Sequence, residues 1–177
     1  PHTPHLAWLG TGQPRNDKVL SPAEAKSLLS GAVVVEEKLD GANLGISLSA
    51  VGRLRAQNRG HYLAEPYSGQ FSRLASWLSL HADALCTSLT PNLILFGEWC
   101  AAKHSLSYDR LPDWFLLFDV FDRGQQAFWS STRRNALAEN VSLICVPQIA
   151  HGRFALSHIE NLLATEPSRY GQGPLEG

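Results

Sequence analysis

The sequence predicts an α+β fold, and three observations support this class. Short apolar or alternating segments typical of strands recur along the chain. Helical signals lie in separate blocks rather than strictly alternating with the strands, which argues against a βαβ series. The chain has 177 residues, 44% of them apolar, enough for one well-packed domain. The strand-like segments are 32–38, 42–49, 53–58, 93–96, 115–120, 127–129 and 143–146.

Four segments carry helix signals. Ser21-Pro22-Ala23-Glu24 is a capping box with proline at the first helical position, and predicts a helix that Gly31 ends. Residues 68–89 place apolar side chains at helical spacing, and Pro91 stops that helix. A helix capped at Ser130 or Ser131 is expected over 132–139. A second capping box, 157–160, predicts a helix to about Thr165.

The remaining segments are expected to be irregular or to complete the sheet. Residues 1–20 contain repeated proline and glycine and predict loop. Residues 32–58 predict an antiparallel meander of three strands. Residues 167–174 predict loop, and 175–177 the start of a further strand.

Composition excludes several classes of protein. The net charge of −1 gives no bulk attraction to nucleic acid, so such a partner needs a local basic face. Cys86, Cys100 and Cys145 form no Cys-x-x-Cys pair, which argues against a structural zinc site or a disulfide framework. No apolar run approaches the ~20 residues of a membrane span, and no signal segment opens the chain. We therefore expect no membrane partner, and an intracellular, cytoplasmic location.

The stretch Lys38-Leu39-Asp40-Gly41 follows an apolar strand and precedes another. Asp-Gly between two strands is a common hairpin signal, so a plain turn is one interpretation. The other interpretation is that Lys38 is a nucleophile. Lysine has a pKa near 10.4 in water, so a nucleophilic lysine needs burial or neighbouring cations to lose its proton near pH 7.

Four more segments bear on this choice: Leu54–Arg59, Ile94–Trp99, Phe115–Val120 and Leu175–Gly177. With Lys38, their order resembles motifs I, III, IIIa and IV of the covalent nucleotidyltransferase superfamily of polynucleotide ligases and capping enzymes. Gly41-Ala42-Asn43 is similar to the RNA ligase 2-like group. The stretch 97–122, with Lys103-His104-Ser105 and 108–112, resembles a cellular RNA ligase subfamily, as does Pro4-His5-Leu6.

The resemblance implies a fold, a reaction and cofactors. The fold is a nucleotidyltransferase (ATP-grasp-like ligase) adenylation domain of antiparallel sheets flanked by helices, spanning 1–177 as a single domain. Lys38 takes AMP from ATP, with Mg²⁺ or Mn²⁺, and releases pyrophosphate. AMP then moves to a 5′-phosphate RNA end, and a 3′-hydroxyl end displaces it, as in RNA repair.

The resemblance also implies roles for individual residues. Glu37 and Phe118 belong to the adenine pocket, and Glu98 contacts ribose or the water shell of the metal. Asp40, Glu98 and Glu176 hold the metal, through water. The full expected nucleotide-binding set is Glu37, Lys38, Asp40, Asn43, Arg55, Glu98, Phe118 and Glu176, and the expected RNA-binding set is Arg55, Arg59, Lys103 and His104.

Each of these residues also has a plainer interpretation. Asp40 can cap a turn, and Phe118 can belong to the core. Arg55 and Arg59 share one face of a strand and can form a solvated edge. Further structural alternatives are a solvent-facing Asn43, a structural His104, and a solvated helix face at Arg133 and Arg134.

The superfamily has a motif V, a Lys-x-Lys strand after motif IV, which does not occur before Gly177. Such lysines neutralise the triphosphate, so we expect the polypeptide as given, incomplete at this end, to form the adenylate poorly. Two alternatives remain: a catalytically impaired module that binds nucleotide or RNA ends, and a DNA ligase or GTP-using capping enzyme. Asn43 and residues 103–112 argue against the latter.

Overall fold

The computed structural model describes residues 4–9 and 19–177, which form two compact units. One contains the described residues up to Glu36 and Gln148–Glu166; the other contains Glu37–Pro147 and Pro167–Gly177. Of the loop predicted for 1–20, residues 1–3 and 10–18 lie outside the described part. The assignment of 1–177 to a single adenylation domain stays a prediction. No described helix is long and apolar enough to cross a membrane.

The smaller unit contains two helices and a two-stranded antiparallel sheet. Helix α1 (Pro22–Leu28) has the predicted capping box, in which the Ser21 N–H donates to Glu24 Oε2 at 2.8 Å. Strand β1 (Val33–Glu36) pairs with β9 (Gln148–Gly152), and α4 (Leu156–Thr165) follows β9. The capping box predicted at 157–160 is wrong, because α4 begins earlier, after Ala155, whose side chain cannot cap it.

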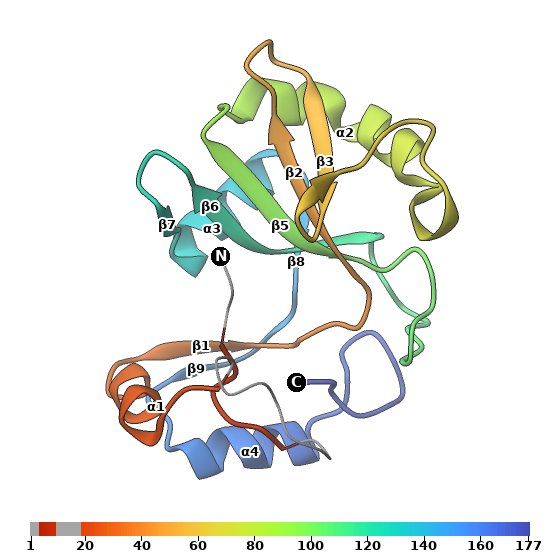
Figure 1. Cartoon of the computed structure of the whole chain (residues 1–177). Helices are drawn as coiled ribbons and strands as arrows, with labels where there is room; N and C mark the ends of the chain where they lie inside the picture. Colours follow the sequence, from red (N-terminus) through yellow and green to blue (C-terminus); the bar gives the residue numbers. More distant parts are fainter. Residues whose placement is uncertain (1–3, 10–18) are drawn as a thin grey trace. The chain divides into compact units, whose positions relative to one another are not determined.

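The larger unit is built on a seven-stranded sheet in the order β4-β3-β2-β5-β6-β7, with β8 also pairing with β6 (Figure 1). All of its pairs are antiparallel except β6–β8, which is parallel. The α+β class is therefore confirmed. The strands are β2 (Ala42–Leu48), β3 (Leu54–Asn58), β4 (His61–Tyr62), β5 (Leu93–Trp99), β6 (Phe115–Asp122), β7 (Ala127–Phe128) and β8 (Ile144–Cys145).

Three further expectations about elements are wrong. Strand β1 does not join the predicted meander, because its partner is β9, a strand that the sequence analysis missed. Helix α2 covers only Leu74–Ser88, after a separate 3₁₀ turn at Gly69–Phe71. Gly69 has a φ of +57°, outside the right-handed helical region. Residues 175–177 form no strand.

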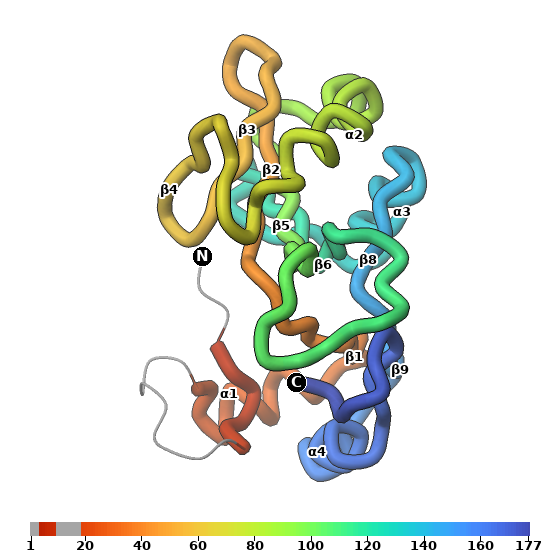
Figure 2. Tube along the Cα trace, turned by 90° about the vertical axis from the view of Figure 1, so that its right-hand side faces the viewer, coloured from red at the N-terminus to blue at the C-terminus, as the bar shows by residue number. Residues whose placement is uncertain are grey.

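Helices α2 and α3 (Ser131–Asn140) lie on the same side of the sheet, as Figures 1 and 2 show. The main core fills the space between them and the sheet. Its fully buried members include Leu44 and Ile46 from β2, Leu95 from β5, and Leu74 and Leu85 from α2. Burying each such side chain contributes roughly 1.5–3 kcal/mol. The other face carries Asn43, Phe96 and Glu98, together with the buried Ile94 and Leu116.

A β-bulge interrupts the pairing of β5 with β6 between Phe96 and Gly97. Leu117 and Val120 both belong to the main core, so the two residues between them, Phe118 and Asp119, both avoid the helix-covered face. In a regular strand these two residues would point to opposite faces. The bulge therefore brings Phe118 and Asp119 together on the face opposite the helices.

Gly97 allows this bulge to pack against the ring of Phe115. A Cβ atom at Gly97 would lie 2.4 and 2.5 Å from Phe115 ring atoms and 2.7 Å from the Leu116 carbonyl oxygen. We expect Gly97→Ala to lower the free energy of unfolding by about 1–3 kcal/mol through overpacking. Urea unfolding measures this loss. Gly173→Ala is the matched control, since no atom lies within 4 Å of its Cβ position; equal loss in both variants contradicts the argument.

Candidate active site

Lys38 lies in the segment that links β1 to β2, and this segment is not a hairpin. Strand β1 pairs with β9, whereas β2 pairs with β3 and β5. The hairpin interpretation of Lys-x-Asp-Gly is therefore wrong. Residues 37–41 are instead a connection between two sheets, and distant parts of the chain hold each end of it.

Glu37 and Lys38 point in opposite senses, as expected for extended chain. Glu37 is buried, with 2% of its surface exposed, and its Oε2 accepts the Arg169 N–H at 3.0 Å. The side chain of Lys38 is 58% exposed, and its amine forms an ion pair with the Glu176 carboxylate. The Lys38 N–H also donates to the Gly177 carbonyl at 2.8 Å. Glu37 thus anchors the 167–177 segment, which in turn brings Glu176 to Lys38.

Asp40 binds a distant loop rather than capping its own turn. Its Oδ2 accepts the Ser105 hydroxyl at 2.5 Å and the Leu106 N–H at 2.7 Å. The Asp40 N–H donates to the Tyr108 hydroxyl at 2.7 Å. Partial burial acts to raise the pKa of Asp40, but these hydrogen bonds to its carboxylate outweigh it and hold the pKa below its usual value. Asp40 therefore positions the loop that carries Lys103 and His104.

Glu98 lies opposite Asn43 in the β2–β5 pair, so both side chains lie on one face of the sheet. Its Oε1 accepts the Gly41 N–H at 3.0 Å. Burial raises the pKa of Glu98 to about 7, against the opposing effects of the Gly41 hydrogen bond and the positive charges of Lys38 and Arg59. The negative charge of Glu176 raises it further. Lys38, Arg59 and Glu176 thus all lie within electrostatic reach of Glu98.

Phe118 packs half-buried against a small apolar cluster of Leu39, Cys100, Leu116 and Val146. Its backbone carbonyl accepts a hydrogen bond from Arg134 Nη1 at 2.6 Å. Arg134 is only 3% exposed, so the predicted solvated face is wrong for this residue. Arg133 does lie on an exposed face, with its guanidinium 3.6 Å above the Trp129 ring. Local sequence gave no sign that one of two adjacent arginines is buried.

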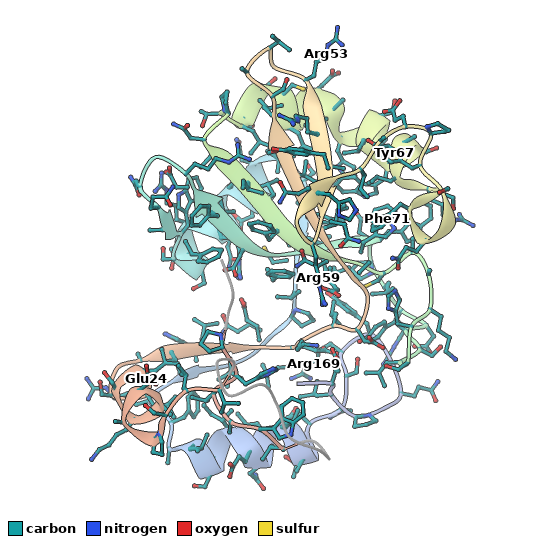
Figure 3. All side chains as sticks on the ribbon, in the orientation of Figure 1. Glu24, Arg53, Arg59, Tyr67, Phe71 and Arg169 are labelled. Carbon is teal, nitrogen blue, oxygen red and sulfur yellow. The ribbon has the colours of Figure 1, made fainter. Side chains whose placement is uncertain are left out.

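The candidate RNA-binding residues lie on two separate segments. Arg55 is exposed on β3, with its guanidinium 3.6 Å above the Tyr62 ring. Arg53 and Arg59 lie just beyond the two ends of β3 (Figure 3). Lys103 and His104 lie on the loop bound by Asp40, where His104 Nε2 is 3.0 Å from Gln70 Oε1. Tyr62 was missed by the sequence analysis, because a lone tyrosine in a two-residue strand carries no local signal.

The carboxylates near Lys38 are the candidate metal ligands. No group of three or more His, Cys, Asp and Glu residues is arranged to hold a metal ion directly in the part of the chain that the structure describes. The carboxylates of Glu98 and Glu176 supply hard oxygen ligands of the kind that Mg²⁺ and Mn²⁺ accept. Both carboxylates also interact electrostatically with the Lys38 amine. Asp40 already uses Oδ2 for two hydrogen bonds, so it fits such an ion less well.

Comparison with known proteins gives the family. A family described as RNA ligase matches residues 31–177, most of the chain. The chain belongs to the RNA ligase family. No curated protein matches it.

Several solved structures share the fold of this RNA ligase family member. Naegleria gruberi RNA ligase with pyrophosphate matches with a TM-score of 0.65 at 20% identity, over 83% of this chain and 45% of that one. A variant of that ligase with ATP and manganese gives 0.67 at 18%, over 88% and 47%. An archaeal ATP-dependent RNA ligase gives 0.54 at 22%, over 76% and 35%. The chain spans about half the length of the Naegleria ligase, and the predicted nucleotidyltransferase fold is confirmed.

The raised pKa of Glu98 makes stability depend on pH. Between the ordinary value of 4.5 and about 7, the folded state keeps a proton that the unfolded state has lost. The free energy of unfolding therefore falls as pH rises through this window, by up to roughly 3 kcal/mol from this group, and levels off above it. We expect Glu98→Gln to remove that part of the decline.

Urea unfolding at pH 5 and pH 7.5 measures the effect. Glu139→Gln, at an exposed position on α3, is the control and should keep the decline of the original protein. If Glu98→Gln and Glu139→Gln behave alike, Glu98 does not carry this pH dependence.

Proposed function

We propose that this protein is an ATP-dependent RNA ligase that joins 5′-phosphate and 3′-hydroxyl RNA ends through AMP bound to Lys38. The observation that carries the proposal is the meeting of Lys38, Glu98 and Glu176, predicted as members of motifs I, III and IV, at one place. These three residues are far apart in sequence. The hydrogen bonds of Gly41 with Glu98 and of Asp40 with Leu106 hold the segment that follows Lys38 in place. Family membership supports ligation of RNA.

In the first step the Lys38 amine attacks the α-phosphorus of ATP. An N–P bond forms, the bond from that phosphorus to the bridging oxygen breaks, pyrophosphate leaves with the electron pair, and the amine loses its proton. Since an amine attacks as the free base, Lys38 must first leave its ion pair with Glu176. Mg²⁺ or Mn²⁺, held through water by Glu98 and Glu176, would offset phosphate charge.

The residues around Lys38 would bind the rest of the nucleotide. Phe118 lies two residues from Leu116, the partner of Glu98, so it lies on the same face of the sheet and offers an aromatic surface for adenine. Asn43 lies beside Glu98 and can donate to a phosphate or ribose oxygen. Contacts of Glu37 and Arg55 with nucleotide, and of Asp40 with a metal through water, belong to the same proposal.

The later steps transfer AMP to RNA and seal it. AMP moves from Lys38 to the 5′-phosphate of one RNA end, so that the N–P bond breaks and a pyrophosphate linkage forms. The 3′-hydroxyl of the other end then attacks that phosphate and displaces AMP. Arg55, Arg59, Lys103 and His104 are the residues proposed to hold the RNA.

A second candidate function is a module that binds nucleotide or RNA ends without chemistry. The exposed Lys38, paired with a carboxylate rather than placed among cations, favours it. It predicts ATP binding by calorimetry with no covalent product. A DNA ligase or capping enzyme would show itself by preferring nicked DNA to nicked RNA, or GTP to ATP.

Labelling with ATP carrying ³²P at the α-phosphate tests the main proposal. Given the complete catalytic domain, including motif V, we expect a labelled protein that survives denaturing electrophoresis. We expect loss of the label, by at least about a hundredfold, in Lys38→Ala, because no other nucleophile replaces the amine. Lys26→Ala, in α1 of the smaller unit, is the control and keeps its label. A ³²P label that is unchanged in Lys38→Ala contradicts the assignment of Lys38 as the nucleophile.

A further inference from the structure

We propose that the sheet face opposite α2 and α3 is a stacking platform for single-stranded RNA, centred on Tyr62 and Arg55 of the β3–β4 hairpin. The inference rests on the proposed function and deepens it, because it says where the RNA next to the reacting RNA end binds. Its first support is the register of the sheet.

Residues directly opposite each other on neighbouring antiparallel strands project to the same face. Tyr62 lies opposite Gln57, Gln57 opposite Gly45, and Gly45 opposite Phe96. Asn43 and Glu98 lie two residues further along the same strands, and so share this face. A continuous row of residues therefore runs from Tyr62 on the edge strand β4 to Phe96 on β5, next to Glu98 of the candidate active site.

The second support is exposed aromatic surface. Tyr62 is 44% exposed, and the exposed Arg55 guanidinium lies 3.6 Å above its ring. At the other end of the sheet Phe128 is 40% exposed and makes an edge contact with Phe121. Gly45 leaves room on the face for Gln57 and Phe96, whose side-chain atoms would lie 2.6 and 3.1 Å from a Cβ there. Flat groups thus occur along this face between small and polar ones.

The third support is charge. Residues 53–63 contain Arg53, Arg55 and Arg59 and no acidic residue, in a chain whose net charge is −1. Arg59 acts electrostatically on Glu98, which places the basic hairpin beside the candidate active site. Positive side chains that follow a phosphate backbone, together with aromatic rings on which bases stack, are the chemistry by which proteins bind single-stranded nucleic acid. A polyanionic strand with exposed bases therefore fits this surface.

Fluorescence anisotropy with a 5′-phosphorylated single-stranded RNA of about twelve nucleotides tests the proposal. We expect Tyr62→Ala to weaken binding about tenfold, the loss typical of one stacked base, while Tyr62→Phe binds as the original protein does. Arg55→Ala should lower the slope of log affinity against log salt by about one, as loss of one phosphate contact does. Leu80→Ala, which is 81% exposed on the helix-covered side, is the control and binds as the original protein does.

The experiment separates this proposal from the function on which it rests. Covalent labelling of Lys38 by ATP, measured on Tyr62→Ala, stays within twofold of the original protein if Tyr62 acts on RNA alone. Absence of label in the original protein, tested with its complete catalytic domain, counts against the proposed function, while the RNA titration still reports on the platform. RNA binding that is equal in Tyr62→Ala and Leu80→Ala, as expected if the hairpin binds a protein instead, overturns the platform.

Discussion

The hydrogen bond from the Gly41 N–H to Glu98 is the contact on which the rest of the site depends. It forms because the chain at Gly41 runs so close to β5 that a Cβ there would lie 2.6 Å from the Trp99 carbonyl oxygen. A side chain at this position would force the loop away from the sheet. Close approach has a cost, since it buries the Glu98 carboxylate and raises its pKa. The same approach sets the start of β2 and the place of Lys38, three residues earlier.

The two faces of the large sheet have different roles: one packs into the main core, and the other carries residues of the candidate active site. One face carries the leucines and aromatic rings that pack on α2 and α3, and the other carries Asn43, Glu98 and Phe118. The bulge in β6 interrupts the regular alternation of side chains, so the successive residues Phe118 and Asp119 both lie on the face opposite the helices. Arg134 supports the arrangement from α3, because it binds the carbonyl of Phe118. That carbonyl lies where the outer neighbour of β6 changes from β8 to β7.

Elements set by local patterns could be predicted from the sequence, whereas those set by distant partners could not. The capping box of α1 and the apolar strands β2, β5 and β6 follow from spacing alone. The partnership of β1 with β9 depends on residues more than a hundred positions away. The burial of Arg134 likewise depends on a carbonyl in another element. For Lys-x-Asp-Gly, local sequence left hairpin and nucleophile open, and the pairing of the sheets excludes the hairpin.

The segment 37–41 is held by partners that are remote in sequence. Glu37 binds Arg169, Lys38 binds Glu176, Asp40 binds Leu106, and Gly41 binds Glu98. Each of these contacts closes a loop of 57 to 138 residues, so each costs chain entropy that must be offset by structure formed elsewhere. Contacts between residues so far apart in sequence slow folding, because the loops must close before the contacts can form. We therefore expect the candidate active site to form late in folding, after the sheet that carries Glu98.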